Sequence, residues 1–353
     1  MKFEHLFSPM QVGKVTYRNR IVSAPMAFGL IVQNPDARDF TYRKLEASAK
    51  GGNGCVIVGE TDVNFVDAVR IPGFRPFDFA KPEEDPETFD AVGEYARRIK
   101  RHGAVALAEL VHCGKEKVPF GPGQEAIGPI ETTNLAGVKV RPMNEDDMTR
   151  IARDFSVSAT YMQKAGFDGV LIHGGHGFLF TQFLSPLMNT RTDSYGGSLE
   201  NRARFPLQIL KAVREAVGPD FLVELRIDGT DHQPGGITPE ETGAFVAMAE
   251  PYITSVHVTC GIYEESVKSG TESSMFHPHG LNIDNAAIIK TYTKLPVGAV
   301  GGINSPELCE QAIAEGKIDF AILGRQMLAD PEFANKARSG HEDQIRRCLR
   351  CYK

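Results

Sequence analysis

Eight short apolar runs, separated by stretches with helical periodicity, constrain the fold of this chain more than any other feature. Their continuous apolar character is typical of strands that are buried on both faces of a parallel sheet. The runs are RIVSAPM (20–26), CVIVGET (55–61), AVALAELVH (104–112), GVLIHGG (169–175), FLVELRI (221–227), SVHVTC (255–260), PVGAVGG (296–302) and FAILGR (320–325). Eight strands that alternate with helices predict an eight-stranded parallel β/α (TIM) barrel.

The segments between the runs carry signals for the start of helices. A residue that can cap a helix stands before a proline in Asp85-Pro86, Thr238-Pro239 and Ser305-Pro306, which is the order expected at a helix N-terminus. A doubly wound open sheet is the alternative architecture. We disfavour it because no GxGxxG sequence follows the first predicted strand.

The length of 353 residues fits a single domain, because α/β barrels often run this long. We predict that the barrel covers residues 1–340 and that 341–353 begins a separate segment. The net charge is −6, from 39 basic and 45 acidic residues without long runs. This balance gives no reason to expect nucleic acid or a membrane surface as a partner.

The six cysteines are scattered, and only Cys348 and Cys351 are close in sequence. A disulfide framework is therefore not expected, and a reducing cytoplasm fits best. The N-terminus has no uninterrupted apolar segment, so a secretory signal is not expected either. No run of about 18 apolar residues is present that could span a bilayer.

A TIM barrel carries its functional groups at the C-terminal ends of its strands and in the loops that follow them. In this chain those places hold many histidine, carboxylate and arginine side chains. They are Glu60, Glu109, His112, His173, His176, Arg226, Asp228, His257 and Arg325. The sequence therefore predicts a cavity rich in these groups at the C-terminal end of the barrel.

The segment after the fourth predicted strand reads HGGHGFLFTQFLSPLMNTRTDSYGGSLENRARF (173–205). It closely resembles the signature of the old yellow enzyme family, and the resemblance extends over the whole chain. The resemblance implies an FMN-dependent ene-reductase that takes a hydride from NADH or NADPH. It also implies that the reduced flavin passes the hydride to the activated C=C bond of a small alkene such as an enone or enoate.

The resemblance also implies which residues contact the flavin. Arg226 matches an arginine near N1 and O2 of the ring, where a cation stabilises the reduced state. The diglycine after strand seven and the Gly-Arg pair after strand eight match the phosphate site, which barrels commonly build from those two loops. The expected cofactor-binding residues are Ala24, Pro25, Met26, Ala27, Glu60, Glu109, Arg226, Gly301, Gly302, Gly324 and Arg325.

His173 and His176 are the expected catalytic pair, since two donors aimed at the substrate oxygen stabilise the negative charge that develops there. The family usually has a tyrosine, which protonates the substrate, where this chain has Phe178. We therefore expect Tyr263, after strand six, to be the proton donor; Cys113 is a weaker candidate, and solvent is the alternative.

Two carboxylates also depart from the family pattern. Glu109 stands where the family has a glutamine that bonds the flavin, and we expect burial to raise its pKa. Glu60 occupies a rim position that is usually small or neutral. Together with His112 these carboxylates could suit a cationic or polyhydroxylated substrate.

Cys348 and Cys351 form a CxxC pair near the end of the sequence. In larger relatives similar to dienoyl-CoA reductases, such a pair begins a four-cysteine iron–sulfur site. We expect these two thiols to be partial ligands of a 4Fe-4S cluster in a longer form that would also bind FAD; the alternative is a cluster site that has decayed. An electron-transfer domain or partner would then accompany the barrel, because a cluster needs four thiolates.

Three other functions remain open. The first is a flavin-dependent amine dehydrogenase of the same superfamily, with Glu60 and Glu109 near a cationic substrate. The second is a metallohydrolase that uses His112, His173, His176 and Asp228 as ligands. The third is a flavin-binding protein without catalytic activity. A homo-oligomer is also left open.

Overall fold

The computed structural model describes residues 2–26, 33–68, 78–119, 124–262 and 270–351. Its centre is a closed barrel of eight parallel strands, in the order β10-β11-β12-β13-β3-β4-β5-β9. These strands are β3 (Ile21–Ser23), β4 (Cys55–Asp62), β5 (Val105–Val111), β9 (Gly169–Gly174), β10 (Leu222–Asp228), β11 (Ser255–Thr259), β12 (Val297–Ala299) and β13 (Phe320–Leu323). Each predicted run overlaps one of them, and β4 and β10 extend one residue beyond their runs, so the predicted TIM barrel is confirmed.

The barrel closes between its first and last strands. In β13 and β3, Leu323 pairs with Ser23 and Ala321 pairs with Ile21. The backbone N–H of Ala24 continues this ladder and donates to the carbonyl of Leu323 at 3.0 Å. Residues from the start and the end of the chain therefore lie side by side at the barrel's C-terminal end.

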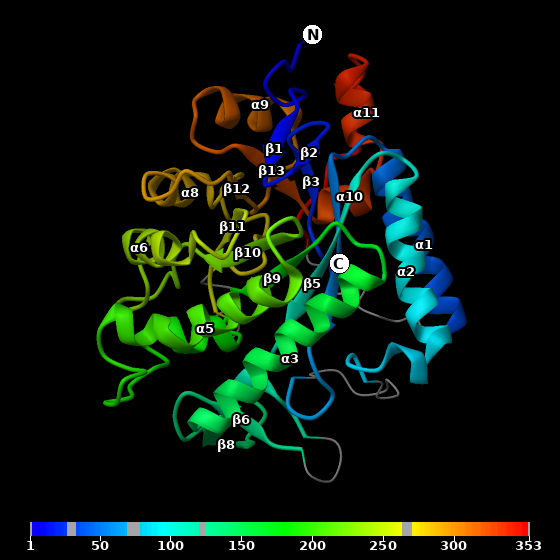
Figure 1. The fold of residues 1–353 in the computed structure, drawn as a ribbon. Coiled ribbons are helices and arrows are strands. Elements are labelled where there is room, and N and C mark those ends of the chain that lie inside the picture. Colours follow the sequence, from blue (N-terminus) through cyan, green and yellow to red (C-terminus); the bar gives the residue numbers. More distant parts are fainter. Residues whose placement is uncertain (1, 27–32, 69–77, 120–123, 263–269, 352–353) are drawn as a thin grey trace.

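Helices surround the barrel (Figure 1). They are α1 (Pro35–Lys50), α2 (Pro86–Lys100), α3 (Glu145–Lys164), α4 (Leu179–Leu184), α5 (Leu199–Val217), α6 (Pro239–Ala249), α8 (Ile283–Lys290), α9 (Pro306–Ala314), α10 (Arg325–Ala329) and α11 (Phe333–Arg338), with 3₁₀ turns at Pro82–Glu84, Gly114–Glu116 and Glu342–Gln344. The side chains of Asp85, Thr238 and Ser305 accept hydrogen bonds from the first turns of α2, α6 and α9. The three predicted helix starts are therefore confirmed.

Two small sheets stand outside the barrel. The hairpin of β1 (Met10–Val12) and β2 (Val15–Tyr17) places the Tyr17 hydroxyl against Glu224 inside the barrel, and His257 binds the same buried carboxylate. The second sheet consists of β6 (Ala126–Gly128), β7 (Thr132–Thr133) and β8 (Lys139–Pro142) and follows β5 in the chain.

The segment after α11 packs back onto the barrel. Ile345 is buried in the main hydrophobic core. Further along, the backbone N–H of Cys348 donates to the Gln326 side chain at 2.9 Å, and its carbonyl accepts from Asn304 at 3.1 Å. Residues 345–350, which we call the C-terminal strap, thereby reach the same end of the barrel as the loops after β12 and β13.

Candidate active site

A cavity of about 380 Å³ opens at the C-terminal ends of the barrel strands. Most of the site residues expected from the sequence line it. They are Ala24, Pro25, Met26, Glu60, Glu109, His173, His176, Arg226, Gly301, Gly302, Gly324, Arg325 and Cys348. Ala27 and Tyr263 fall outside the described residues, and Cys351 is exposed and is not among the lining residues.

The two expected catalytic histidines lie next to each other. Their ring centroids are 5.0 Å apart, and the Phe178 ring packs with its edge toward His173 at 5.3 Å. The strand β9 ends at Gly174 and thus places His173 directly on the barrel rim. His176 follows in a left-handed backbone conformation with φ of 63°, which directs its side chain back toward the first histidine's ring.

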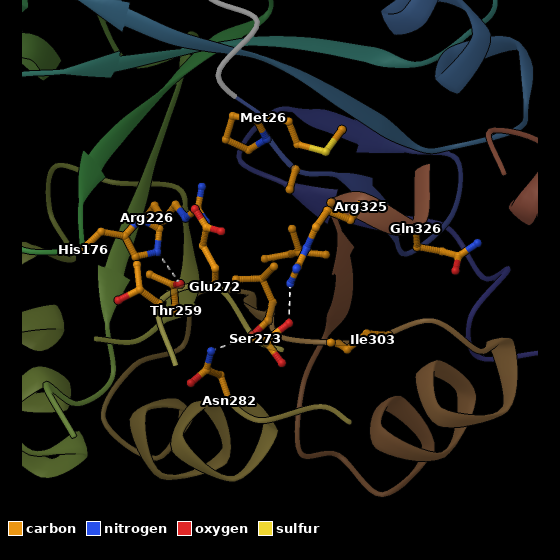
Figure 2. A pocket seen from close by; sticks show the side chains of 18 of the residues that line it. Met26, His176, Arg226, Thr259, Glu272, Ser273, Asn282, Ile303, Arg325 and Gln326 are labelled. Carbon is orange, nitrogen blue, oxygen red and sulfur yellow. Dashed lines mark hydrogen bonds between the residues drawn. The ribbon is translucent and has the colours of Figure 1, made fainter. Parts of the chain in front are cut away.

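His176 is fixed from two sides. Its backbone N–H donates to the Asp228 carboxylate at 2.8 Å, and its Nε2 lies 2.8 Å from the Thr259 hydroxyl. Figure 2 shows this contact between His176 and Thr259 at the cavity wall. Burial, together with the nearby charges of Arg226 and His173, holds the pKa of His176 well below its ordinary value. The imidazole is therefore neutral and carries one N–H.

Glu109 lies between His173 and the Arg226 guanidinium, and these neighbours overturn the raised pKa expected from the sequence. Its Oε1 lies 3.0 Å from Nδ1 of His173, in an ion-pair contact without hydrogen-bond alignment, and 3.4 Å from the Arg226 guanidinium. Burial by itself would raise the pKa of Glu109, but His173 and Arg226 together bring it below its ordinary value. The side chain is a carboxylate.

A glycine turn and an arginine form another corner of the cavity. Gly301 and Gly302 have φ of 134° and 65°, a region that L side chains rarely adopt. A Cβ at Gly302 would come within 2.8 Å of the Ser273 hydroxyl, so a side chain there would require its neighbours to shift. Arg325 donates to the Ser273 carbonyl at 2.5 Å, as Figure 2 shows. Gly324 directly precedes α10.

Three of the polar residues expected at strand ends are not among the cavity lining. His112 bonds Asp67 at 3.1 Å, Asp228 holds the backbone of His176, and His257 faces Glu224 in the barrel interior. Within the described ranges, no group of three or more His, Cys, Asp or Glu side chains could hold a metal ion. The arrangement required by a metallohydrolase is therefore not formed by these residues.

The sequence model of the NADH:flavin oxidoreductase / NADH oxidase family matches residues 5–344 of the chain. The chain belongs to this family. The resemblance to the old yellow enzyme family is thereby confirmed, and the family is one of flavin-dependent NADH/NADPH oxidoreductases. FMN and a reduced nicotinamide are the cofactors expected for such a family member.

Curated relatives of this chain are named for different activities. An NADH oxidase of Thermoanaerobacter brockii is 34% identical over 352 residues, covering 99% of this chain and 53% of that protein. A cinnamate reductase of Clostridium sporogenes is 32% identical over 375 residues, covering 99% of this chain and 55% of that protein. The chain therefore spans about half the length of these curated relatives.

Among solved structures, histamine dehydrogenase from Rhizobium sp. 4-9 superposes on this chain with a TM-score of 0.87 at 26% identity. The match covers 99% of this chain and 50% of that chain. None of the helices in the described ranges is long and apolar enough to cross a bilayer.

Several residues that line the cavity were not predicted from the sequence. Thr259 ends β11 and could have been found as a polar residue at a strand end. Ser273, Asn282 and Arg350 also line the cavity. They come from the loop after β11, the start of α8 and the C-terminal strap, and no motif in the sequence marks them.

Proposed function

We propose that this chain is an FMN-dependent ene-reductase that reduces the activated C=C bond of an enone or enoate. The observation that carries the proposal is the adjacent pair of His173 and His176 in the wall of one cavity, with Arg226 and Glu109 beside them. When bound, FMN would accept a hydride from a reduced nicotinamide and deliver it to the alkene. The cinnamate reductase relative, named for an enoate, supports this substrate class.

The cavity residues fit FMN. The Gly301-Gly302 turn and the Arg325 guanidinium offer backbone space and positive charge for a phosphate group. Arg226, at the end of β10, would place a cation beside the ring, where it favours the reduced form. The Glu109 carboxylate can accept from a ring N–H but cannot donate to a ring oxygen.

The two histidines would bind the substrate oxygen. Because the pKa of His176 is lowered and its Nε2 contacts Thr259, it can donate from Nδ1 when the Thr259 hydroxyl donates to Nε2. Nδ1 of His173 faces Glu109, so its Nε2 can face a ligand. Nε2 donates to the ligand when both ring nitrogens carry hydrogen. Two such donors would stabilise negative charge on the substrate oxygen as the hydride arrives.

Separate measurement of the two half-reactions tests this proposal. His173→Ala or His176→Ala should slow oxidation of the reduced flavin by 2-cyclohexenone by about 10²- to 10³-fold, the cost of one oxyanion donor. Reduction by NADH should change little. His5→Ala, at an exposed histidine bonded to Glu310, is the control. Equal loss in both half-reactions would instead mean that the histidines hold the flavin or the fold.

A second candidate is oxidation of an amine C–N bond, which the likeness to histamine dehydrogenase and the two cavity carboxylates, Glu60 and Glu109, support. The charge of Glu109 is already matched by Arg226 and His173, which weighs against it. Anaerobic mixing of oxidised enzyme with histamine and with secondary amines separates the two candidates. Bleaching of the flavin by an amine, without any reaction with enones, would favour the dehydrogenase.

The CxxC pair belongs to the same proposal. Cys348 and Cys351 would supply two thiolate ligands to a 4Fe-4S cluster in a longer form of the protein, and FAD would bind outside the barrel there. The described part of this chain does not complete such a site, since its other cysteines, Cys55, Cys113, Cys260 and Cys309, are buried elsewhere and a cluster needs four thiolates.

A further inference from the structure

Two arginine side chains from distant parts of the sequence meet at the diglycine corner of the cavity. Arg325 begins α10, and Arg350 comes from the C-terminal strap. Both contact Ser273: Arg325 donates to its carbonyl at 2.5 Å, and Nη1 of Arg350 lies 3.4 Å from its hydroxyl. The cavity therefore has two guanidinium groups beside the Gly301-Gly302 turn.

Arg350 is buried without an acidic partner in the described part of the chain. It is 7% exposed, and its Nη1 donates to the carbonyls of His277 at 2.8 Å and Pro278 at 3.2 Å. A guanidinium at this position is bound by neutral oxygens, so its charge is left for an anion to balance.

His279 connects Arg350 to the glycine turn. Its Nδ1 lies 2.8 Å from the Gly302 carbonyl, which can only accept, so Nδ1 carries the hydrogen. Nη2 of Arg350 can only donate, so Nε2 of His279, 3.2 Å away, accepts from it. This chain of hydrogen bonds holds the guanidinium against Gly302, where a Cβ would come within 2.7 Å of Nη1.

We infer that Arg350 is a second phosphate-binding arginine of the cofactor site and completes an anion site with Arg325 and the diglycine turn. The inference rests on the proposed binding of FMN. It makes the C-terminal strap a part of the cofactor site. Two guanidinium groups suit a phosphate because each can donate to its oxygens through charge-assisted hydrogen bonds.

Comparison of FMN with riboflavin, which lacks the phosphate, tests the inference on the full chain freed of flavin. Arg350→Gln keeps amide donors near the loop carbonyls but removes the charge. We expect its FMN dissociation constant to rise on the order of 10- to 100-fold, as for loss of a charge-assisted hydrogen bond. Its affinity for riboflavin should be unchanged. Arg347→Gln is the control, at an exposed strap arginine paired with Glu307.

The outcomes separate the inference from the proposed function. An equal loss of FMN and riboflavin affinity in Arg350→Gln would overturn the inference, because Arg350 would then only hold the loop. Unchanged affinity for both flavins would overturn the inference as well. Riboflavin binding also reports whether the Arg350→Gln protein is folded. If the unchanged protein binds no flavin, the proposed function itself fails, whereas FMN binding that is insensitive to Arg350 removes only this inference.

Discussion

At the scale of single residues, the site depends on neighbours that set the protonation of each group. Glu109 is ionised because Arg226 and His173 outweigh its burial, and His176 is neutral because burial, Arg226 and the His173 ring disfavour its charged form. The identity of these residues could be predicted from strand ends, but the direction of the Glu109 pKa could not. It depends on contacts between three strands, and the sequence alone does not give them.

Phe178 packs against His173 in the cavity wall, in the place where the family has a tyrosine. Phe178→Tyr should put a phenol hydroxyl in the cavity and supply the substrate proton. We expect oxidation of reduced flavin by an enone to accelerate, by up to roughly 10²- to 10⁴-fold if proton transfer limits the rate. Stopped-flow rates in H₂O and D₂O measure this.

The matching control for that substitution is Phe180→Tyr, at a phenylalanine of α4 buried in the core rather than lining the cavity. Equal rates and equal solvent isotope effects in Phe178→Tyr and the unchanged enzyme would mean that another group already delivers the proton. Tyr263→Phe then asks whether that group is Tyr263.

Thr259 orients His176 through its hydroxyl. Thr259→Val keeps the shape of the side chain but removes this contact, so the ring hydrogen of His176 is no longer held on Nδ1. The enone half-reaction should slow by about 5- to 30-fold, the equivalent of one hydrogen bond of roughly 1–2 kcal/mol. Thr259→Ser, which restores a hydroxyl, should recover the rate, and failure of this rescue would refute the orienting role.

At the scale of elements, local signals predicted most of the barrel. The eight apolar runs and the proline-preceded caps at Asp85, Thr238 and Ser305 act within a few residues, and the structure contains the corresponding strands and helices. The loops were not predictable in this way. Ser273 reaches the cavity only through contacts with α10 and the strap, which are about 50 and 77 residues away in the chain.

Asp67 links three elements and should make stability depend on pH. Burial would raise its pKa, but hydrogen bonds from His112, after β5, and Arg150, on α3, hold it far below the ordinary value. A carboxyl with a lower pKa in the folded state stabilises the fold above its unfolded pKa, near 4, and loses this contribution as the pH falls further. Asp67→Asn should therefore cost roughly 1–3 kcal/mol at pH 7.

Thermal unfolding from pH 7 down to pH 3 measures that contribution. The difference in Tm between Asp67→Asn and the unchanged protein should shrink as the pH falls below about 4. Asp39→Asn removes a carboxylate from an exposed ion pair with Arg43 and should show little effect at any pH. A Tm difference that stays constant from pH 7 to pH 3 would contradict the assignment of this pH dependence to Asp67.

At the scale of the whole molecule, the barrel and the segment after it share one core. The sequence predicted a boundary at residue 340, which stays a prediction, yet Ile345 is buried with the barrel's core residues and Arg346 donates to Asp330 at 2.9 Å. We expect the strap to behave as a part of the barrel because its contacts are with α10 and the cavity loops.

A chain that ends at Gly340 tests this expectation. It would lose the buried Ile345 and the Arg350 side chain, so its Tm should fall and it should retain less FMN after gel filtration. Ile345→Ala, which leaves the strap in place, should lower Tm through a loss of up to about 2–5 kcal/mol but keep the flavin. A shortened chain with unchanged Tm and flavin content would show that 341–353 is an independent segment.

The pairing of β13 with β3 also bears on how the protein is made. Met26 follows β3 and lines the cavity. The neighbouring strand β13 and Arg325, which line it from the other side, are synthesised about 300 residues later. At about 5–20 residues per second, this delay is roughly 15–60 s. A nascent chain that ends before Arg325 lacks one wall of the cavity. Uptake of the cofactor would therefore be among the last events of biogenesis, and retained flavin would mark a chain whose synthesis has passed that point.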